Sequence, residues 1–134
     1  MARASLVVVG TGIKIANQCT IEARHHIESA DVVFEVVGDR LAQNFLRSLN
    51  RNVVSLQPFY GRDRARSDTY EQMVETIVAA VRAGKRVCAA FYGHPGVYVY
   101  PSHESVRRAR EAGFEAEMLP AVSADACIFA DLGF

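Results

Sequence analysis

The sequence predicts an α/β protein in which a wound, mostly parallel five-stranded sheet is flanked by helices. Short apolar segments typical of buried strands alternate, over 134 residues, with longer segments whose apolar side chains recur at helical spacing. Turn residues separate these segments, and the chain contains no internal repeat or low-complexity tract. Because consecutive parallel strands need a crossover, usually a helix, the alternation favours a single wound α/β domain over residues 1–134.

The chain opens with a strand, a helix and a second strand. Residues 5–9 form a continuous run rich in β-branched side chains, as in a buried strand, and the turn at 10–12 ends it. Thr20 is suited to cap a helical segment that extends to Ala30. The second strand is expected at residues 31–37.

A helix over residues 39–49, a short strand over 52–56 and a polar loop over 57–66 come next. A longer helix is expected to start at Ser67 or Asp68, because either side chain can cap its first turn. Its apolar stripe consists of Met73, Ile77, Val78 and Val81.

The second half continues the same alternation. Gly84 ends the long helix, and residues 86–91 form an apolar fourth strand. A helix capped by Ser102 should extend to residue 112, followed by a fifth strand over 114–119. The last helix is expected over residues 123–131, with Ser123 as its cap.

The loop after the fourth strand is the most informative segment for function. The run Phe91-Tyr92-Gly93-His94-Pro95-Gly96-Val97-Tyr98 lies at the carboxyl end of a strand, where open α/β sheets bind ligands. Gly93 and Gly96 permit positive φ and a close approach of the backbone to a ligand, while Pro95 stiffens the loop. Two tyrosines and a histidine accompany these glycines, so we predict a ligand-binding loop.

Within this loop, Gly93-His94-Pro95-Gly96-Val97 resembles the S-adenosylmethionine loop of the tetrapyrrole methylase family, whose usual form is Gly-Asp-Pro. The variant with His and a second Gly is similar to one branch, the borosin peptide-backbone α-N-methyltransferases. Further segments agree with that branch, namely residues 9–12, 66–73, 118–125 and 129–132. The resemblance runs from about residue 5 to residue 134.

The resemblance implies the N-terminal domain of the tetrapyrrole methylase fold, S-adenosyl-L-methionine as cofactor, and methyl transfer to a peptide backbone nitrogen. It also implies a second domain after residue 134, a cofactor cleft between the two domains, a separate or fused precursor peptide as substrate, and homodimerisation. A tetrapyrrole or small-molecule carbon methylase is the alternative, although the turn at 10–14 departs from the Gly-Pro-Gly-Asp pattern of tetrapyrrole enzymes. A half-domain that binds a cofactor or partner without turnover also stays open.

Carried over residue by residue, the catalytic positions of the borosin branch are Tyr60, Arg66, Tyr70 and Tyr92. The expected cofactor contacts are Tyr92, Gly93, His94, Gly96, Val97, Tyr98, Ser123 and Ala124. A spacing of four places Arg66 and Tyr70 on the same side of a helix, provided the helix extends back to Arg66. A guanidinium would stabilise charge on an amide oxygen, and a tyrosinate would accept the N–H proton. A solvated basic loop is the alternative interpretation.

Composition argues against several other classes of protein. The formal net charge is zero, with acids and bases interspersed, so we expect neither nucleic acid nor an acidic membrane surface as a partner. No apolar run approaches the ~20 residues that span a bilayer, and we interpret the apolar start as a strand rather than a signal peptide. Cys19, Cys88 and Cys127 are odd in number and widely spaced, as in reduced cytoplasmic proteins. Adjacent His25 and His26 would point to different helix faces, so no metal site is expected.

Two expectations concern burial. Cys88 and Cys127 lie in apolar segments and should be buried, which leaves Cys19 as the accessible thiol. The final segment, residues 126–134, is strongly apolar, and its exposure would create a surface prone to association. Either another domain or partner covers this segment, or the last helix docks on its own sheet.

Overall fold

The computed structural model of the chain describes residues 3–61 and 63–133, and its elements alternate as the sequence predicts. The strands are β1 (Ser5–Gly10), β2 (Val32–Val36), β3 (Val53–Ser55), β4 (Arg86–Phe91) and β5 (Glu115–Met118). The helices are α1 (Ile21–Ser29), α2 (Arg40–Leu49), α3 (Arg66–Arg82), α4 (Tyr100–Glu111) and α5 (Ala124–Leu132), with a short 3-10 helix η1 (Gln57–Phe59) inside the expected polar loop.

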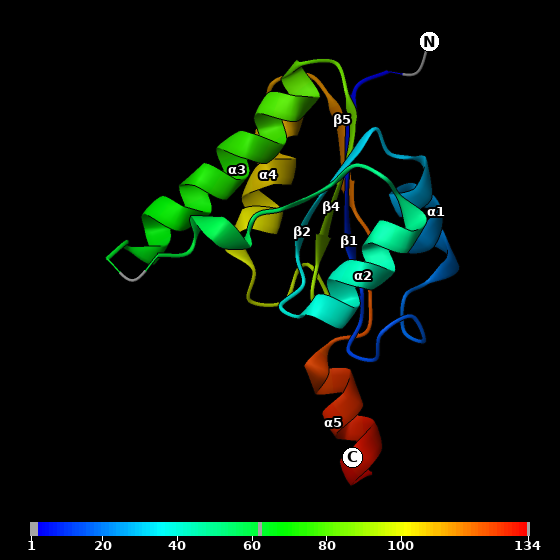
Figure 1. Cartoon of the computed structure of the whole chain (residues 1–134). Helices are drawn as coiled ribbons and strands as arrows, with labels where there is room; N and C mark the ends of the chain where they lie inside the picture. The colour runs from blue at the N-terminus through cyan, green and yellow to red at the C-terminus, as the bar shows by residue number, and fades with distance from the viewer. Residues whose placement is uncertain (1–2, 62, 134) are drawn as a thin grey trace.

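The five strands form one sheet in the order β3-β2-β4-β1-β5, and each neighbouring pair is parallel. Helices α1 and α2 cover one face and α3 and α4 cover the other (Figure 1). Crossovers directed toward β3 therefore run over one face, and those directed back toward β5 run over the other, as right-handed connections require. The expected wound α/β fold is confirmed.

Each face of the sheet has its own hydrophobic core. On one side, the stripe of α3 is buried, as predicted, against alternate residues of β1, β2 and β4. On the other side, Ile27 of α1 and Leu46 of α2 are fully buried against Val9 and Val33. Because β1 and β4 are covered on both faces, they are apolar along most of their length.

Two of the predicted helix caps are confirmed. The Thr20 hydroxyl accepts a hydrogen bond from the Ala23 amide at 3.0 Å, and the Ser123 hydroxyl accepts one from the Ala126 amide at 3.2 Å. Each hydroxyl satisfies an amide that has no partner within its own helix.

Two other predicted caps are wrong. Helix α3 starts earlier, at Arg66, and its N-cap residue Ala65 makes no side-chain hydrogen bond. Helix α4 starts at Tyr100, so Ser102 lies inside its first turn, where the buried hydroxyl donates to the carbonyls of Val99 and Pro95. The serine thus stabilises the preceding loop instead of capping a helix.

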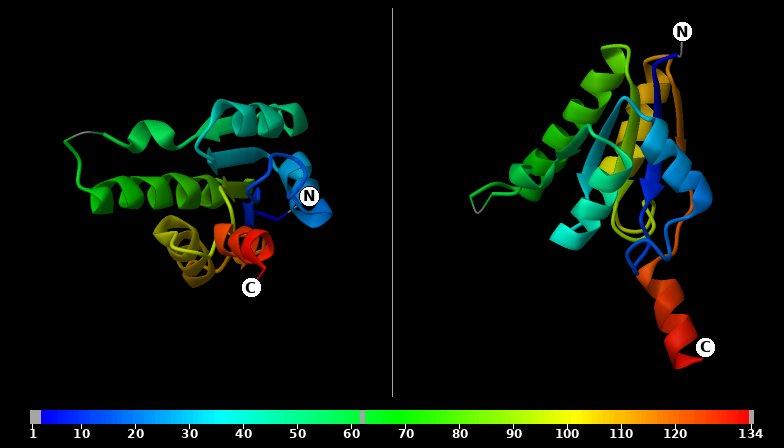
Figure 2. Two further views of the ribbon diagram at one scale, coloured as in Figure 1. Left: turned by 90° about the horizontal axis from the view of Figure 1, so that it is seen from below. Right: turned by 45° about the vertical axis from the view of Figure 1, so that its right-hand side comes forward.

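Helix α5 projects from the carboxyl end of the sheet and does not fold back on it (Figures 1 and 2). No described residue of α5 is buried, and Ile128 and Leu132 are 48% and 66% exposed. Of the two alternatives, docking of this helix on its own sheet is therefore wrong. Phe134 lies outside the described residues.

The cysteines allow a direct test of burial. Cys88 is buried in β4, and burial raises the pKa of its thiol to about 12. Cys127 was expected to be buried, but it is only half-buried on the projecting α5, with its sulfur 3.7 Å from the Gln18 amide nitrogen. Cys19 is also half-buried. We expect a thiol reagent to label Cys19 and Cys127 in the native protein while Cys88 stays protected, as measured by peptide mass spectrometry.

Protein unfolded in urea, in which all three thiols should react, provides the control for this experiment. Equal labelling of Cys88 in native and unfolded protein would contradict its placement in the sheet.

Among residues 3–61 and 63–133, no helix has the length and apolar character needed to cross a membrane.

Candidate functional site

The candidate site lies at the carboxyl edge of the sheet, where β1 and β4 end side by side. The register pairs Gly10 with Phe91, and the Thr11 amide donates to the Phe91 carbonyl at 2.9 Å. Gly12 and Gly93 then exchange two backbone hydrogen bonds, of 3.1 and 3.3 Å. The turn after β1 and the loop after β4 are thereby joined into one structure.

Glycine at position 10 makes this junction possible. A Cβ atom built on Gly10 would lie 2.0 Å from the Gly93 carbonyl oxygen and 2.8 Å from Cδ of Pro95. No side chain fits between these atoms, because real Cβ atoms do not approach backbone so closely. The end of β1 therefore depends on glycine for space.

The loop over residues 92–98 combines a left-handed glycine with a left-handed tyrosine. Gly93 has φ of +69°, as its role in the turn predicts, whereas Gly96 has no left-handed φ and instead leaves room beside His94 and the Met118 sulfur, each 3.1 Å from a built Cβ. Tyr98 adopts φ of 59° and is 97% exposed. Such a conformation is uncommon for a tyrosine and is frequent at binding sites.

Two histidines hold the loop from either end. The Gly96 amide donates to Nδ1 of His94 at 2.9 Å, so the proton of the neutral ring lies on Nε2. From α4, His103 lies 2.9 Å from the Gly96 carbonyl through Nε2, which donates because a carbonyl can only accept. His103 was not among the predicted site residues. The position of His103 in the first helical turn after the loop could have indicated this contact.

A cavity of about 160 Å³ lies between this loop and the start of α5, and we call it the loop hollow. It is lined by seven of the eight predicted cofactor contacts, namely Tyr92, Gly93, His94, Val97, Tyr98, Ser123 and Ala124. Gly96 is not among its lining residues, but it fixes His94 as described above. Ile13 and Asp125 also line the hollow and were not predicted.

A second cavity, of about 240 Å³, lies on the other side of the loop, and we call it the tyrosine hollow. All five tyrosines of the sequence line it, namely Tyr60, Tyr70, Tyr92, Tyr98 and Tyr100. Its other lining residues are apolar, among them Val36, Met73 and Phe91. Tyr92, Val97 and Tyr98 line both hollows, so the loop forms the wall between them.

Three of the four predicted catalytic residues line the tyrosine hollow, and the fourth, Arg66, contacts one of them, Tyr70. Helix α3 extends back to Arg66, as the predicted pairing requires, and Nη1 of Arg66 donates to the Tyr70 hydroxyl at 3.3 Å. The Tyr60 ring meets the Tyr70 ring edge to face at 6.5 Å, and the Tyr100 ring lies 6.3 Å from Tyr70 on a tilted plane. Tyr100 was missed, although its position just after the loop could have indicated it.

The surroundings of the hollow shift the pKa values of Tyr60 and Arg66. Burial raises the pKa of Tyr60, and the nearby Tyr70 adds to this effect, so Tyr60 is a neutral hydrogen-bond donor at physiological pH. The hydrogen bond to Tyr70 also raises the pKa of Arg66, which keeps its guanidinium charged. Arg66, through its bond to Tyr70, thus brings a permanent cation beside the hollow, and Tyr60 brings a neutral hydrogen-bond donor, a pair suited to stabilising a developing oxyanion.

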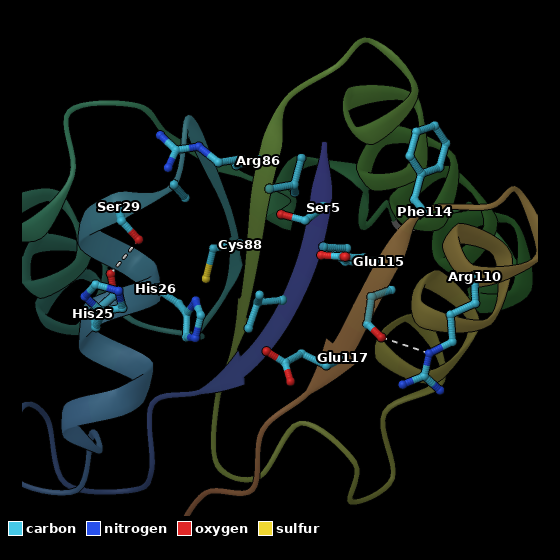
Figure 3. A pocket seen from close by; sticks show the side chains of 15 residues that line it. Ser5, His25, His26, Ser29, Arg86, Cys88, Arg110, Phe114, Glu115 and Glu117 are labelled. Atoms are coloured by element: carbon cyan, nitrogen blue, oxygen red, sulfur yellow. Dashed lines mark hydrogen bonds between the residues drawn. The ribbon is translucent and has the colours of Figure 1, made fainter. Parts of the chain in front are cut away.

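A larger cavity, of about 670 Å³, lies elsewhere. It covers the face of β1 and β4 between α1 and β5, as Figure 3 shows, and none of its lining residues is a predicted site residue. Its polar side chains include His25, His26 and Glu117. Within the described part of the chain, no group of three or more His, Cys, Asp or Glu side chains is placed to hold a metal ion.

Comparison with known proteins identifies the family. The sequence model of the tetrapyrrole (corrin/porphyrin) methylase family matches residues 5–134 of this chain. A methyltransferase and type I borosin cyclic peptide precursor from Coprinopsis marcescibilis is 48% identical over 128 residues, which cover 96% of this chain and 33% of that protein. The methyltransferase and omphalotin A precursor from Omphalotus olearius is 46% identical, with 96% and 31% covered. The chain thus spans about a third of the length of these relatives.

The fold comparison agrees with the sequence comparison. The crystal structure of uroporphyrin-III C-methyltransferase from Thermus thermophilus superposes with a TM-score of 0.73 at 25% identity, covering 98% of this chain and 53% of that one. Family model, curated relatives and fold point to one assignment, and the chain belongs to the tetrapyrrole methylase family.

Proposed function

We propose that this chain forms the catalytic and cofactor-binding part of an S-adenosyl-L-methionine-dependent methyltransferase that methylates backbone amide nitrogens of a peptide. The observation that carries the proposal is the pair of hollows that share the loop at 92–98. One hollow offers a glycine-rich wall for a cofactor, and the other is lined by all five tyrosines, with Arg66 bonded to Tyr70. The relatives named as methyltransferases and cyclic peptide precursors support a peptide acceptor.

The loop hollow fits one end of the cofactor rather than the whole molecule. Its volume, about 160 Å³, is below the range of roughly 300–1,000 Å³ typical of ligand pockets. His94 keeps its Nε2–H free to donate to a ligand, and the positive end of α5 lies beside it. A second domain would supply the remaining wall, so we expect the 134 residues alone to bind the cofactor weakly.

Transfer to an amide nitrogen needs help from the protein, because the nitrogen lone pair is delocalised into the carbonyl. When bound, S-adenosyl-L-methionine supplies a methyl group already activated on a sulfonium. In our proposal, Arg66 stabilises the negative charge that develops on the amide oxygen, and Tyr70, acting as a tyrosinate beside that cation, would take the N–H proton as the N–C bond forms. Tyr60 and Tyr92 orient the amide within the hollow, with neutral Tyr60 as a hydrogen-bond donor.

Mass spectrometry of co-expressed peptides tests this function. We expect the complete coding sequence to add methyl masses to a precursor peptide, and fragment ions to place each methyl on a backbone nitrogen. An Arg66→Ala protein produced at the same level provides the control. A methyl on a tetrapyrrole carbon would support the alternative methylase, and no product with any acceptor would support a half-domain without turnover.

We also propose that the protein self-associates through α5. Ile128, Phe129 and Leu132 are each about half exposed or more on this projecting helix. Covering a few hundred Å² of apolar surface, at roughly 25 cal/mol per Å², stabilises an assembly by several kcal/mol before the cost of association. We expect light scattering to show an oligomer, and an Ile128→Glu, Leu132→Glu protein to be smaller. A wild-type monomer at high micromolar concentration would contradict this.

A further inference from the structure

The start of α3 has little core packing to hold it. Arg66, Ser67 and Asp68 are exposed, and the first turns of the helix extend beyond the sheet (Figures 1 and 2). Thr69 is the first buried residue, and its hydroxyl donates to the Phe59 carbonyl at 3.2 Å. A helix end without a side-chain cap and with few apolar contacts frays easily. The placement of Tyr70, whose ring packs against those of Tyr60 and Tyr100, therefore also depends on polar contacts to neighbouring elements.

Arg108 of α4 provides the strongest of these contacts. Its two terminal nitrogens donate to the two carboxylate oxygens of Glu71 at 2.7 and 2.8 Å, and its Nε donates to Glu104 at 2.9 Å. The side chains of Arg108 and Glu104 are 26% and 13% exposed and that of Glu71 is 42% exposed, so solvent screens the bond to Glu104 only in part and the bonds to Glu71 more strongly. The paired bonds fix both distance and orientation, and Glu71 directly follows Tyr70.

The carboxylates of this cluster stay ionised over a wide pH range. The hydrogen bond from Arg108 lowers the pKa of Glu71, and bonds from Arg107 and Arg108 lower the pKa of Glu104 to about 2. Lowered carboxyl pKa values mean that the ion pairs persist as pH falls through the ordinary range of glutamate and are lost only below it.

The same end of α4 holds the other half of the site. His103 and Ser102 bind the carbonyls of Gly96 and Pro95, and the Tyr100 ring lies 6.3 Å from the Tyr70 ring. Helix α4 thus contacts both the loop between the two hollows and the start of α3. The distance between Tyr70 and the loop depends on how firmly α3 is fastened to α4.

We propose that Arg108 is a positioning residue for methyl transfer, which fastens the start of α3 to α4 and thereby sets Arg66 and Tyr70 against the loop at 92–98. Arg108 is not among the lining residues of either hollow, so it acts through Tyr70 and not on the substrate. This inference rests on the proposed function, because it concerns the geometry that the reaction needs.

The neighbouring arginine offers a matched control. Arg107 is 59% exposed and pairs with Glu104 and Glu111, both on α4 itself. An Arg107→Gln substitution removes the same charge from the same helix and two ion pairs, yet it leaves the link between α3 and α4 in place. A difference between the two variants therefore reports on the link rather than on charge or helix stability.

The kinetic test compares Arg108→Gln, Arg108→Lys and Arg107→Gln in the complete coding sequence. We expect Arg108→Gln to lower kcat by up to roughly 100-fold, the scale of a misplacement of about 1 Å, with the cofactor dissociation constant unchanged. Arg108→Lys should recover part of this loss, because an ammonium keeps the charge but not the paired bonds. Arg107→Gln should match wild type. Equal kcat values for Arg108→Gln and Arg107→Gln would overturn the proposal.

A double-mutant cycle tests whether the effect passes through Tyr70. In a Tyr70→Phe background, Arg108→Gln should cause a smaller loss than in wild type, because one of the two groups that it positions is already absent. Losses that multiply in full would overturn this route and indicate general destabilisation.

Hydrogen exchange provides a readout that needs no activity. Amides at the start of α3 should exchange faster in Arg108→Gln than in wild type, and at the wild-type rate in Arg107→Gln. Unchanged exchange in Arg108→Gln would overturn the link itself. If wild type methylates nothing while exchange responds as expected, the proposed function fails and the link stands.

Discussion

Replacement of Arg66 by Ala is expected to lower kcat for peptide methylation by about 100- to 1,000-fold, the usual effect of removing one preorganised group that stabilises an oxyanion. Arg66 donates to Tyr70 at the edge of the tyrosine hollow and carries a permanent charge there. Because the loop hollow lies on the other side of the loop, cofactor affinity should be unchanged. Initial rates of methyl incorporation and calorimetry with S-adenosylhomocysteine measure the two quantities.

Tyr70→Phe separates the hydroxyl from the ring in the same assay. It removes the oxygen that contacts Arg66 but keeps the ring that packs between Tyr60 and Tyr100, so kcat should fall while the melting temperature is retained. An Arg51→Ala protein, altered at an exposed arginine before β3, serves as the control for loss of charge. Wild-type rates in both Arg66→Ala and Tyr70→Phe would refute their catalytic roles.

Gly10→Ala is expected to destabilise the fold and to disturb the site together. The added Cβ would lie 2.0 Å from the Gly93 carbonyl oxygen and 2.7 Å from Cβ of Ala121, and neither backbone nor Cβ can swing aside like a flexible side chain. Overpacking of this kind lowers the free energy of unfolding by about 1–3 kcal/mol. The shift must also displace the loop joined to Gly12, so cofactor binding should be lost with stability.

Gly61→Ala is the matched control for this prediction. A Cβ at Gly61 would lie 3.6 Å from the nearest atoms, which belong to the side chain of Arg64, and this is ordinary van der Waals contact. We expect thermal unfolding of Gly61→Ala to match wild type and that of Gly10→Ala to occur at clearly lower temperature. A Gly10→Ala protein with the wild-type melting temperature would show that β1 does not approach the loop as described.

The helix starts show how far local patterns can be trusted. Thr20 and Ser123 cap their helices as predicted, because each hydroxyl meets only the amides of its own first turn. Ser102 has the same local signal, but its hydroxyl bonds carbonyls of the loop that α4 must hold. A serine or threonine at a helix start indicates that its hydroxyl needs a hydrogen-bond partner. Tertiary packing decides whether that partner is an amide of the helix or a carbonyl of another segment.

The sequence by itself determined the alternation of strands and helices, the buried stripe of α3 and the loop at 92–98, because periodicity and turn chemistry are local properties. Only the tertiary structure decided that five tyrosines from separate segments line one hollow, that Arg108 pairs with Glu71 on another helix, and that α5 stands away from the sheet. These contacts depend on crossover direction and strand register, which bring together residues far apart in the chain.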